Sequence, residues 1–339
     1  MSDQLNIAVV GATGVVGETM LNILSKRKFP VGNIFALASE RSIGKTVLFG
    51  NRKLKVLDLA TFDFAAADIA LFSAGASVSN IFAPKASLAG CIVIDNTSRF
   101  RYEDEIPLVI TEVNSDKIKD YKKRGIIANP NCSVMQMLVA LKPIYDAVGI
   151  KRINVATYQA VSGAGKTAIS ELIHQTSSLL NGRPLDLKGS KQIAFNAIPH
   201  IDEFQDNGYT KEEMKMVWET TKILDDDNIV VNPTAVRIPV FYGHSEAVHI
   251  ETKKKISSTD ACKLLKKAPG VKLINGLEIG KYPTAVTEGS GKDSVYVGRV
   301  REDISHPSGI NMWIVSDNIR KGAALNSVQI AEILVRKYL

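Results

Sequence analysis

Cysteine, histidine and aromatic residues are scarce in this chain of 339 residues, and each scarcity argues against a class of protein. The three cysteines, Cys91, Cys132 and Cys262, form no Cys-x-x-Cys pair, and an odd number argues against a disulfide framework. The five histidines show no pair at metal-ligand spacing, so no metal site is expected. Aromatic residues make up 6% of the chain and do not alternate with basic residues, as they often do on nucleic-acid-binding surfaces.

Long apolar runs and long runs of one charge are also missing. No apolar stretch reaches the roughly 18 residues that a membrane helix needs, and the first residues lack the pattern of a secretory signal. The longest basic run is Lys253-Lys254-Lys255, although the formal net charge is +7. Neither nucleic acid nor a membrane is therefore expected as a partner, and the positive charge suits small anionic ligands. Reduced cysteines fit a cytoplasmic location.

What is present is enough apolar sequence, at 45% hydrophobic residues, for two domains with separate cores. Residues 5–10 read as a buried strand, residues 11–17 are Gly-Ala-Thr-Gly-Val-Val-Gly, and an amphipathic helix follows. Strand, glycine turn and helix in this order predict the first unit of a Rossmann-type, doubly wound parallel sheet. Gly11 permits the tight turn, Gly14 lets the backbone approach a pyrophosphate, and Gly17 lets helix and strand pack closely.

The turn after the second strand bears on which cofactor binds. A strand is predicted over 34–38, and NAD-binding proteins usually place an acidic residue at its end to hold the ribose hydroxyls. Here Arg41 and Ser42 follow the strand, and both can bind the 2′-phosphate that distinguishes NADP from NAD. NADP(H) is therefore the expected cofactor, and Glu40 leaves NAD as the alternative.

Two further apolar strands, 69–72 and 92–95, are followed by small or polar residues that include Ser73. This order places ligand groups at the carboxyl ends of parallel strands, where such sheets bind their ligands. The segment after the second strand carries Arg99 and Arg101 at the rim of the predicted site. Solvated surface charge is the alternative interpretation of both arginines.

The sequence Asn-Pro-Asn-Cys at 129–132 lies between an extended run and a helix. Residues 125–128 are strand-like, a proline breaks the run, and residues 133–144 have the apolar spacing of a helix. Cys132 is therefore expected beside the positive end of a helix dipole, a position that favours the nucleophilic thiolate. From this corner alone the alternative of a small core cysteine stays open.

The character of the sequence changes after the helix that follows Cys132. Residues 152–161 alternate like a strand, and Ser-Gly-Ala-Gly-Lys-Thr at 162–167 then opens a helix that runs to about Leu180. The turn is similar to the end of a P-loop, but Ala160 stands where that motif requires glycine. A glycine turn close to the cofactor is favoured over a nucleoside-triphosphate site.

A helix is predicted to begin at Thr210, because Thr210 and Glu213 have the spacing of a capping box. Glu212 and Lys215 lie three residues apart on one face of this helix. On spacing alone, an ordinary surface ion pair is the favoured interpretation of Glu212 and Lys215.

A strand is predicted over 234–242, with an interruption at 243–245 before it resumes over 247–251. Arg237 and His244 would point to opposite faces of an ideal strand. A proline and a glycine between them break that ideality, so a shared cleft stays open. A histidine beside glycine at the end of a strand suits an acid/base role.

The remaining elements complete a second, α+β domain with a mixed sheet. Strands are predicted over 295–300 and 310–315, and an amphipathic helix over 322–337. The apolar, strand-rich content of this domain predicts a surface for a second copy of the chain. A homodimer is expected, and a tetramer stays open.

Five motifs together resemble those of the aspartate-semialdehyde dehydrogenase family, in order and over nearly the whole chain. They are Gly-Ala-Thr-Gly-Val-Val-Gly at 11–17, Asn-Pro-Asn-Cys at 129–132, Gln-Ala-Val-Ser-Gly-Ala-Gly at 159–165, Glu-Glu-Met-Lys at 212–215 and Arg-Ile-Pro-Val-Phe-Tyr-Gly-His at 237–244. Each motif alone is weak evidence, whereas five at matching spacing are specific.

The resemblance implies a role for each of these positions. Cys132 would form an acyl-enzyme, Gln159 would orient it, and His244 would act as acid and base. The substrate would be held by Arg237 at its carboxylate and Glu212 at its ammonium, and the phosphate by Lys215 and Arg101. Asn131, next to the nucleophile, can donate a hydrogen bond to an oxyanion. The implied NADP contacts are the glycine turn with Thr13, Gly14, Val15 and Val16, then Arg41, Ser42, Ser73, Ser162, Gly163 and Asn318.

The reaction implied is the reversible, NADPH-dependent reduction of aspartyl phosphate to aspartate semialdehyde and phosphate, on the route to lysine and diaminopimelate, threonine and methionine. Residues 1–130 with 322–339 would form the NADP-binding domain, and 131–321 the catalytic and dimerisation domain. A reductase of N-acetyl-glutamyl phosphate and a non-catalytic NADP-binding protein are the alternatives. Glu212 argues against the first, because an acetylated amine needs no carboxylate partner.

Overall fold

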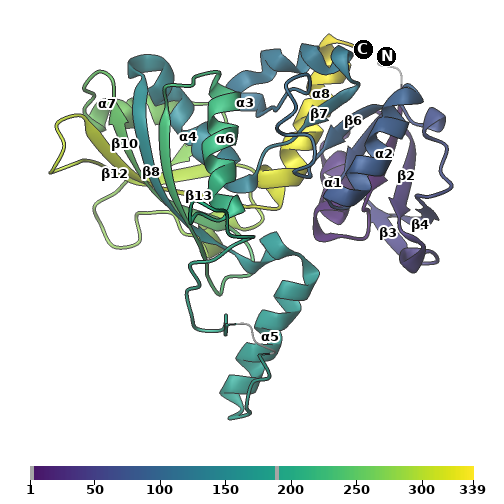
Figure 1. Cartoon of the computed structure of the whole chain (residues 1–339), viewed down its shortest axis with the longest axis horizontal. Helices are drawn as coiled ribbons and strands as arrows, with labels where there is room; N and C mark the ends of the chain where they lie inside the picture. The colour runs from purple at the N-terminus through teal and green to yellow at the C-terminus, as the bar shows by residue number, and fades with distance from the viewer. Residues whose placement is uncertain (1–3, 188–190) are drawn as a thin grey trace. The chain divides into compact units, whose positions relative to one another are not determined.

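The computed structural model describes residues 4–187 and 191–339, and contacts within the chain divide it into two units. The first unit contains residues 1–131 and 323–339, and the second contains residues 132–322. Both are shown as ribbons in Figure 1. Each has its own sheet and its own helices, and each is described by itself.

The first unit is built on a seven-stranded sheet in the order β3-β4-β2-β1-β5-β6-β7. All neighbouring strands are parallel except β3 and β4, which form an antiparallel edge. The strands are β1 (Leu5–Val10), β2 (Val31–Ala38), β3 (Thr46–Phe49), β4 (Arg52–Asp58), β5 (Ile69–Phe72), β6 (Ile92–Asp95) and β7 (Ile126–Ala128). The predicted Rossmann-type sheet is confirmed, while β3 and β4 were not predicted.

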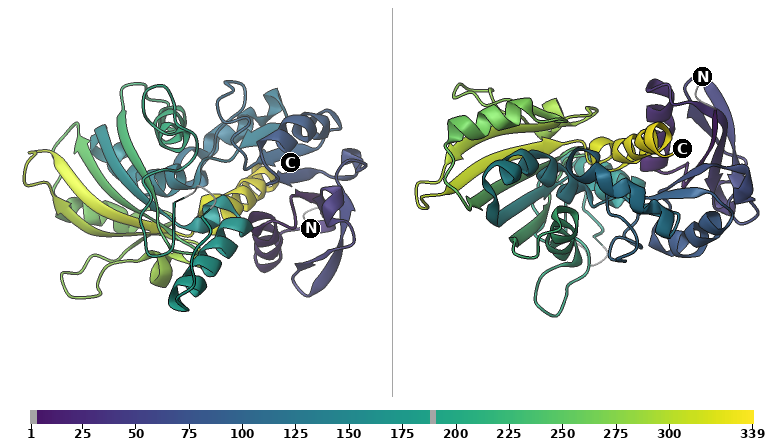
Figure 2. Two further views of the ribbon diagram at one scale, coloured as in Figure 1. Left: turned by 60° about the horizontal axis from the view of Figure 1, so that its bottom comes forward. Right: turned by 90° about the horizontal axis from the view of Figure 1, so that it is seen from above.

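The helices of this unit are α1 (Val15–Lys26), α2 (Ala76–Leu88), α3 (Thr111–Asn114) and α8 (Asn326–Lys337), with a longer 3₁₀ segment at Ser115–Lys123. The core joins Ile7 of β1 and Met20 of α1 to Val328 and Leu334 of α8. The C-terminal helix therefore packs with the first helix of the chain, as Figure 2 shows in yellow and purple. The helix predicted over 322–337 begins later than expected, because residues 320–325 form a π-helical turn.

The glycine turn of this unit has the close approach that the sequence predicts. Gly11 has φ +84°, a conformation that favours glycine. A Cβ added at Gly17 would lie 2.2 Å from the carbonyl oxygen of Gly11, so α1 can pack on β1 only without a side chain there. Gly14 is the N-cap of α1 and has no side chain to cap it, which leaves backbone amides at this helix end for an anion.

The second unit is built on a six-stranded mixed sheet in the order β11-β12-β13-β10-β8-β9. The pairs β8–β9 and β11–β12 are parallel and the other neighbours are antiparallel. The strands are β8 (Ile150–Gln159), β9 (Val230–Arg237), β10 (His244–Thr252), β11 (Val271–Leu273), β12 (Val295–Glu302) and β13 (Gly309–Ser316). The predicted mixed sheet is confirmed.

The helices of this unit are α4 (Cys132–Val148), α5 (Lys166–Leu180), α6 (Lys211–Leu224) and α7 (Ser258–Lys267). Helix α4 contacts β8, β10, β12 and β13 and also α6 and α7, so it lies across the sheet. Helix α5 projects away from the sheet (Figure 1). The capping box predicted at Thr210 and Glu213 is present at the start of α6.

The prediction of one strand over 234–242 is wrong. Strand β9 ends at Arg237, the chain turns through 238–243, and β10 begins at His244. The turn depends on Gly243, which has φ +91°, and a Cβ there would lie 2.6 Å from the carbonyl oxygen of Ala285. Arg237 and His244 therefore belong to different strands, and the parity argument for a single strand does not apply.

Candidate active site

The end of β8 brings three of the predicted site residues together. In the parallel pair β8–β9, Gln159 is opposite Arg237, and in the antiparallel pair β8–β10, Tyr158 is opposite Ser245. His244 precedes Ser245, so it lies beside Gln159 on the other side of β8. Because laterally paired residues project from the same face of a sheet, Arg237, Gln159 and His244 share one face at one end of the sheet.

Cys132 lies at the predicted corner between strand and helix, although α4 begins at Cys132 itself, one residue before the predicted start at 133. Its side chain is partly exposed. A Cβ on Gly322 would lie 2.7 Å from the Cβ of Cys132, so only glycine fits beside the nucleophile candidate. The other cysteines are unsuited to that role. Burial, with the charge of Asp68, raises the pKa of the Cys91 thiol to about 12, and burial also raises the pKa of Cys262.

Gln159 connects the sheet to helix α6. Its Nε2 donates to Glu212 Oε1 at 3.2 Å and lies 3.4 Å from His244 Nε2. Thr157, two residues earlier on the same strand face, donates its hydroxyl hydrogen to Gln159 Oε1 at 3.0 Å. All four side chains are buried. The contacts at both ends of the amide fix which end of Gln159 faces the imidazole.

His244 is fully buried, and its ring is held by the main chain. The backbone N–H of Ala160 donates to His244 Nδ1 at 3.0 Å. Burial and the positive charge of Arg237 together lower the pKa of the imidazole to about 3, against the opposing effects of the Glu212 charge and the Gly243 main chain. The ring is therefore neutral at neutral pH, and its one ring N–H can donate a hydrogen bond to a substrate oxygen or sulfur.

Arg237, the last residue of β9, is partly buried near the nucleophile candidate. Its Nη1 donates to the carbonyl oxygen of Ala160 at 2.7 Å. Burial lowers the pKa of this guanidinium, while the charges of Glu212 and Cys132 act in the opposite direction. A Cβ added at Gly163 would lie 3.2 Å from Arg237 Nη1 and 3.6 Å from His244 Nε2. The main chain of Gly163 thus borders the space between guanidinium and imidazole.

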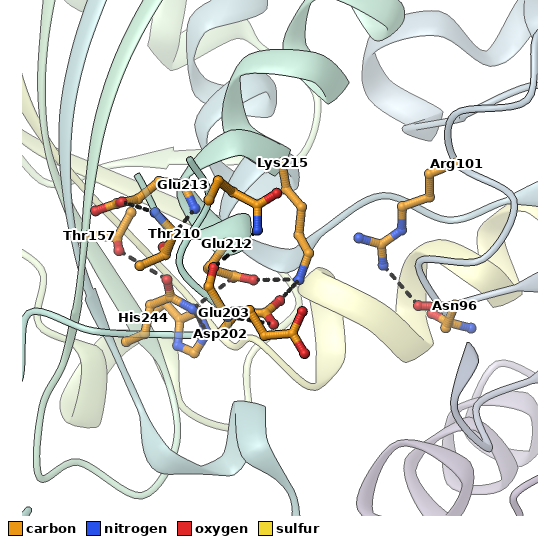
Figure 3. Close-up of polar contacts among 12 residues, drawn as sticks. Asn96, Arg101, Thr157, Asp202, Glu203, Thr210, Glu212, Glu213, Lys215 and His244 are labelled. Atoms are coloured by element: carbon orange, nitrogen blue, oxygen red, sulfur yellow. Dashed lines mark hydrogen bonds and ion pairs between the residues drawn. The ribbon is translucent and has the colours of Figure 1, made fainter. Parts of the chain in front are cut away.

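Glu212 and Lys215 form a mostly buried cluster on the first turns of α6, drawn in Figure 3. Lys215 Nζ lies 2.9 Å from Glu212 Oε2 and 2.7 Å from Asp202 Oδ2. Burial lowers the pKa of Lys215, but the two carboxylates outweigh it and the net shift is upward. The expectation of an ordinary surface ion pair is wrong, because side-chain exposure is 12% for Lys215 and 8% for Glu212.

Arg101 belongs to the first unit and is 6% exposed. Its Nη2 donates to the carbonyl oxygen of Asn96 at 2.9 Å, which holds the guanidinium beside the end of β6 (Figure 3). Arg99 is partly exposed and pairs with Glu103 at 2.6 Å. Asn131, also in this unit and 7% exposed, precedes Cys132 directly.

The residues predicted to bind the cofactor in the first unit converge at the carboxyl ends of β1, β2 and β5. Thr13 Oγ1 lies 3.4 Å from Ser42 Oγ, and Ser73 donates to the carbonyl oxygen of Val10 at 3.1 Å. A Cβ on Gly11 would lie 2.9 Å from the main chain of Ser73.

The other predicted cofactor residues of this unit lie at the same edge of the sheet. Val15 and Val16 begin α1, and Arg41 is exposed on the turn after β2. Backbone amides, hydroxyls and one cation at this edge fit a dinucleotide phosphate.

In the second unit, Asn318 and Ser162 contact each other. The side-chain amide of Asn318 donates to Ser162 Oγ at 3.0 Å, and its Oδ1 accepts from the backbone N–H of Gly243 at 2.9 Å. Asn318 therefore supports the turn that carries His244.

The sequence did not predict this role of Asn318, nor the contacts made by Thr157 and by the main chain of Ala160. The alternation of β8 places Thr157 on the face of Gln159, whereas a main-chain donor leaves no signal in the sequence.

Among the described residues, no group of His, Cys, Asp or Glu has the arrangement of a metal site, and no helix is long and apolar enough to cross a membrane.

Comparison with known proteins gives matches over the whole chain. Residues 6–121 match the family model "Semialdehyde dehydrogenase, NAD binding domain", and residues 141–321 match "Semialdehyde dehydrogenase, dimerisation domain". The aspartate-semialdehyde dehydrogenase of Legionella pneumophila is 65% identical over 340 residues, covering 100% of this chain and 98% of the relative. That of Shewanella violacea is 62% identical, covering 100% of both chains.

Solved structures agree with these matches. The crystal structure of aspartate semialdehyde dehydrogenase II from Vibrio cholerae complexed with ASA has a TM-score of 0.97 and 59% identity, covering 100% of both chains. Aspartate semialdehyde dehydrogenase with NADP from Candida albicans has a TM-score of 0.78 and 25% identity, covering 98% of both chains.

Proposed function

The chain belongs to the aspartate-semialdehyde dehydrogenase family, and we propose that it performs the reaction of that family through a thioester on Cys132. The reaction is the reversible, NADPH-dependent reduction of aspartyl phosphate to aspartate semialdehyde and phosphate, in the biosynthesis of lysine, diaminopimelate, threonine and methionine. The observation that carries the proposal is the set of Cys132, Gln159, His244 and Arg237 within one unit, each from a different secondary-structure element or its end. A cytoplasmic location suits these metabolites.

Cys132 attacks the acyl carbon of aspartyl phosphate as a thiolate, and phosphate leaves. The step divides one difficult substitution into two easier ones, because a thioester is itself an activated acyl group. The position of Cys132 as the first residue of α4 favours the thiolate form of its side chain. Asn131 donates to the oxyanion that forms on the acyl carbon.

Arg237 binds the substrate carboxylate, since a guanidinium offers two parallel donors to a carboxylate. Glu212 attracts the substrate ammonium, and its contacts with Gln159 and Lys215 hold it in place. Lys215 and Arg101 bind the phosphate. Both are cations with little exposure, so their charge is screened less by water than that of a surface lysine.

When bound, NADPH supplies the hydride that reduces the thioester carbonyl. His244 is neutral in the buried site, so its ring N–H stabilises the departing sulfur or the developing oxyanion by donating a hydrogen bond, and the sulfur leaves as a thiolate. Gln159 orients the acyl group beside the imidazole. We assign the cofactor to the turn at Gly11–Gly17 with Thr13, Arg41, Ser42 and Ser73, and to Ser162, Gly163 and Asn318 of the second unit.

For domain organisation, we propose that residues 1–130 with 322–339 bind NADP(H), and that 131–321 carry catalysis and dimerisation. A homodimer would use the face of the six-stranded sheet that carries Ser245, Ala247 and Trp313. Ala247 and Trp313 lie opposite each other on β10 and β13 and are only partly buried, as expected of a face that a second chain covers.

The experiment that tests the proposal follows NADPH formation from aspartate semialdehyde, phosphate and NADP⁺. We expect turnover by the wild-type enzyme and by Cys262→Ala, and loss of turnover in Cys132→Ala with NADPH binding retained. Turnover of the N-acetyl-glutamate semialdehyde analogue at an equal rate would show a different substrate class. Persistent turnover in Cys132→Ala would exclude the covalent route.

A further inference from the structure

We propose that the main chain of Ala160 is a positioning element that holds the His244 imidazole in the tautomer with its hydrogen on Nε2, and that the same residue ties this ring to the guanidinium of Arg237. The inference rests on the proposed function for its catalytic consequence. The tautomer itself is a property of the resting protein and is measured without turnover.

The first step is the hydrogen bond between the backbone N–H of Ala160 and His244 Nδ1, at 3.0 Å. A peptide N–H can only donate, so Nδ1 accepts and carries no hydrogen. In a neutral imidazole the hydrogen must then be on Nε2. Both residues have 0% exposure, so no bulk water competes for the Nδ1 lone pair. Burial and the nearby guanidinium, which keep the pKa of the ring low, agree with a neutral ring.

The second step concerns Gln159, whose Nε2 lies 3.4 Å from His244 Nε2. Thr157 donates to Gln159 Oε1, and Glu212 accepts from Gln159 Nε2, so the amide nitrogen is the end that faces the ring. Two N–H donors cannot form a hydrogen bond with each other. The Nε2 hydrogen of His244 is therefore not used by Gln159 and remains available to a substrate oxygen or sulfur.

The third step is the other main-chain group of Ala160. Its carbonyl oxygen accepts from Arg237 Nη1 at 2.7 Å. Ala160 has φ −64° and ψ 150°, an extended conformation. One residue thus touches both the group proposed to hold the substrate carboxylate and the imidazole proposed to donate a hydrogen bond to the reacting sulfur or oxygen. A carboxylate bound at Arg237 consequently places the reacting carbon at a set distance from His244 Nε2.

Ala160 is itself held on both sides. The backbone N–H of Ile238 donates to the carbonyl oxygen of Gln159 at 3.0 Å, and the backbone N–H of Val161 donates to that of Val240 at 2.9 Å. The segment 238–240 after β9 therefore fixes the main chain immediately before and after Ala160. This rigidity is what a positioning element requires.

The test replaces Ala160 with lactic acid in the full-length enzyme. The change turns the peptide N–H into an ester oxygen without adding bulk, and it leaves the carbonyl that contacts Arg237 in place. Proline would be a poor probe, because its ring carbon would occupy the position of the hydrogen that points at Nδ1. The control is the same ester at Ala164, which removes a backbone donor from the neighbouring turn but not the one bonded to His244.

In the Ala160 ester we expect kcat to fall by about tenfold to a hundredfold, which is a part of what acid/base catalysis contributes. The KM for aspartate semialdehyde should change by less than about twofold, because the contact with Arg237 remains. The acid limb of the pH profile should move to higher pH, because a lost donor at Nδ1 makes the ring easier to protonate. The Ala164 ester should retain wild-type kcat and profile.

The direct readout is the nitrogen NMR spectrum of the histidine side chains, with His244→Asn identifying the His244 signals. The wild-type protein should carry hydrogen on Nε2 and none on Nδ1, and the Ala160 ester should populate the other tautomer. Hydrogen on Nδ1 in the wild type would overturn the inference, even if the ester does not fold. A fall in kcat with an unchanged tautomer would overturn it too. If instead Cys132→Ala remained active, the proposed function would fail while the tautomer assignment stood.

Discussion

The buried imidazole of His244 should lower the stability of the folded enzyme as the pH falls. Replacing His244 should remove this loss of stability. Its side chain has 0% exposure, and burial together with Arg237 lowers its pKa to about 3 in the folded protein. In the unfolded chain the pKa is about 6.5. Between these values the unfolded state binds more protons than the folded state. The contribution of the neutral ring is therefore complete above about pH 6.5 and is lost as the pH falls toward 3.

The size of the effect follows from the pKa difference. A difference of roughly 3.5 pKa units corresponds to about 5 kcal/mol over the whole window. Between pH 7 and pH 5, the histidine of the unfolded chain becomes almost fully protonated, while that of the folded protein stays neutral. The free energy of unfolding should therefore fall by about 2 kcal/mol over this range. His244→Asn removes the titrating group and keeps an acceptor near the position of Nδ1 for the Ala160 N–H.

The assay is urea unfolding of the wild type and of His244→Asn at pH 7 and pH 5, with one protein concentration throughout because an oligomer is expected. The wild type should lose about 2 kcal/mol more than the variant between these pH values. His174→Asn, at an exposed position, should behave as the wild type. Equal losses in the wild type and in His244→Asn would refute the argument that burial keeps this ring neutral.

Three further outcomes are expected. Gly163→Ala should raise KM for aspartate semialdehyde about fivefold, roughly 1 kcal/mol, because its Cβ would sit 3.2 Å from Arg237 Nη1; an unchanged KM would remove Gly163 from the substrate pocket. Arg41→Ala should weaken NADPH binding more than NADH binding by about tenfold, measured by titration, and an unchanged ratio would contradict the 2′-phosphate assignment. Glu212→Gln should raise the same KM by about tenfold or more; unchanged kinetics would mean that Glu212 only supports Lys215.

The elements that the sequence predicts best are those whose signal is local. Strands β5 and β6 were predicted with their observed bounds because each is a short apolar run that ends in small or polar residues. The corner at Cys132 was predictable because Pro130 stops the preceding strand and an apolar helical period follows. Burial of the strand and packing of the helix agree with these local preferences.

The predictions that failed did so because tertiary contacts, which a local sequence pattern does not show, decide the structure there. Ile238 and Val240 continue an apolar alternation past Arg237, but the chain there pairs with the segment at Gln159 and Val161 rather than extending β9. Spacing alone made Glu212 and Lys215 a surface pair, since it cannot tell that the first turns of α6 are buried against β9. Main-chain groups such as those of Ala160 are the same in every sequence, so their role depends entirely on the fold.

The most direct test of the central claim is to withhold phosphate and look for the thioester. With aspartate semialdehyde and NADP⁺ alone, the enzyme should release one equivalent of NADPH per active subunit in a burst. Mass analysis of the peptide that contains Cys132 should then show an added aspartyl group, which phosphate removes. No burst, or an acyl group on any residue other than Cys132, would contradict the account.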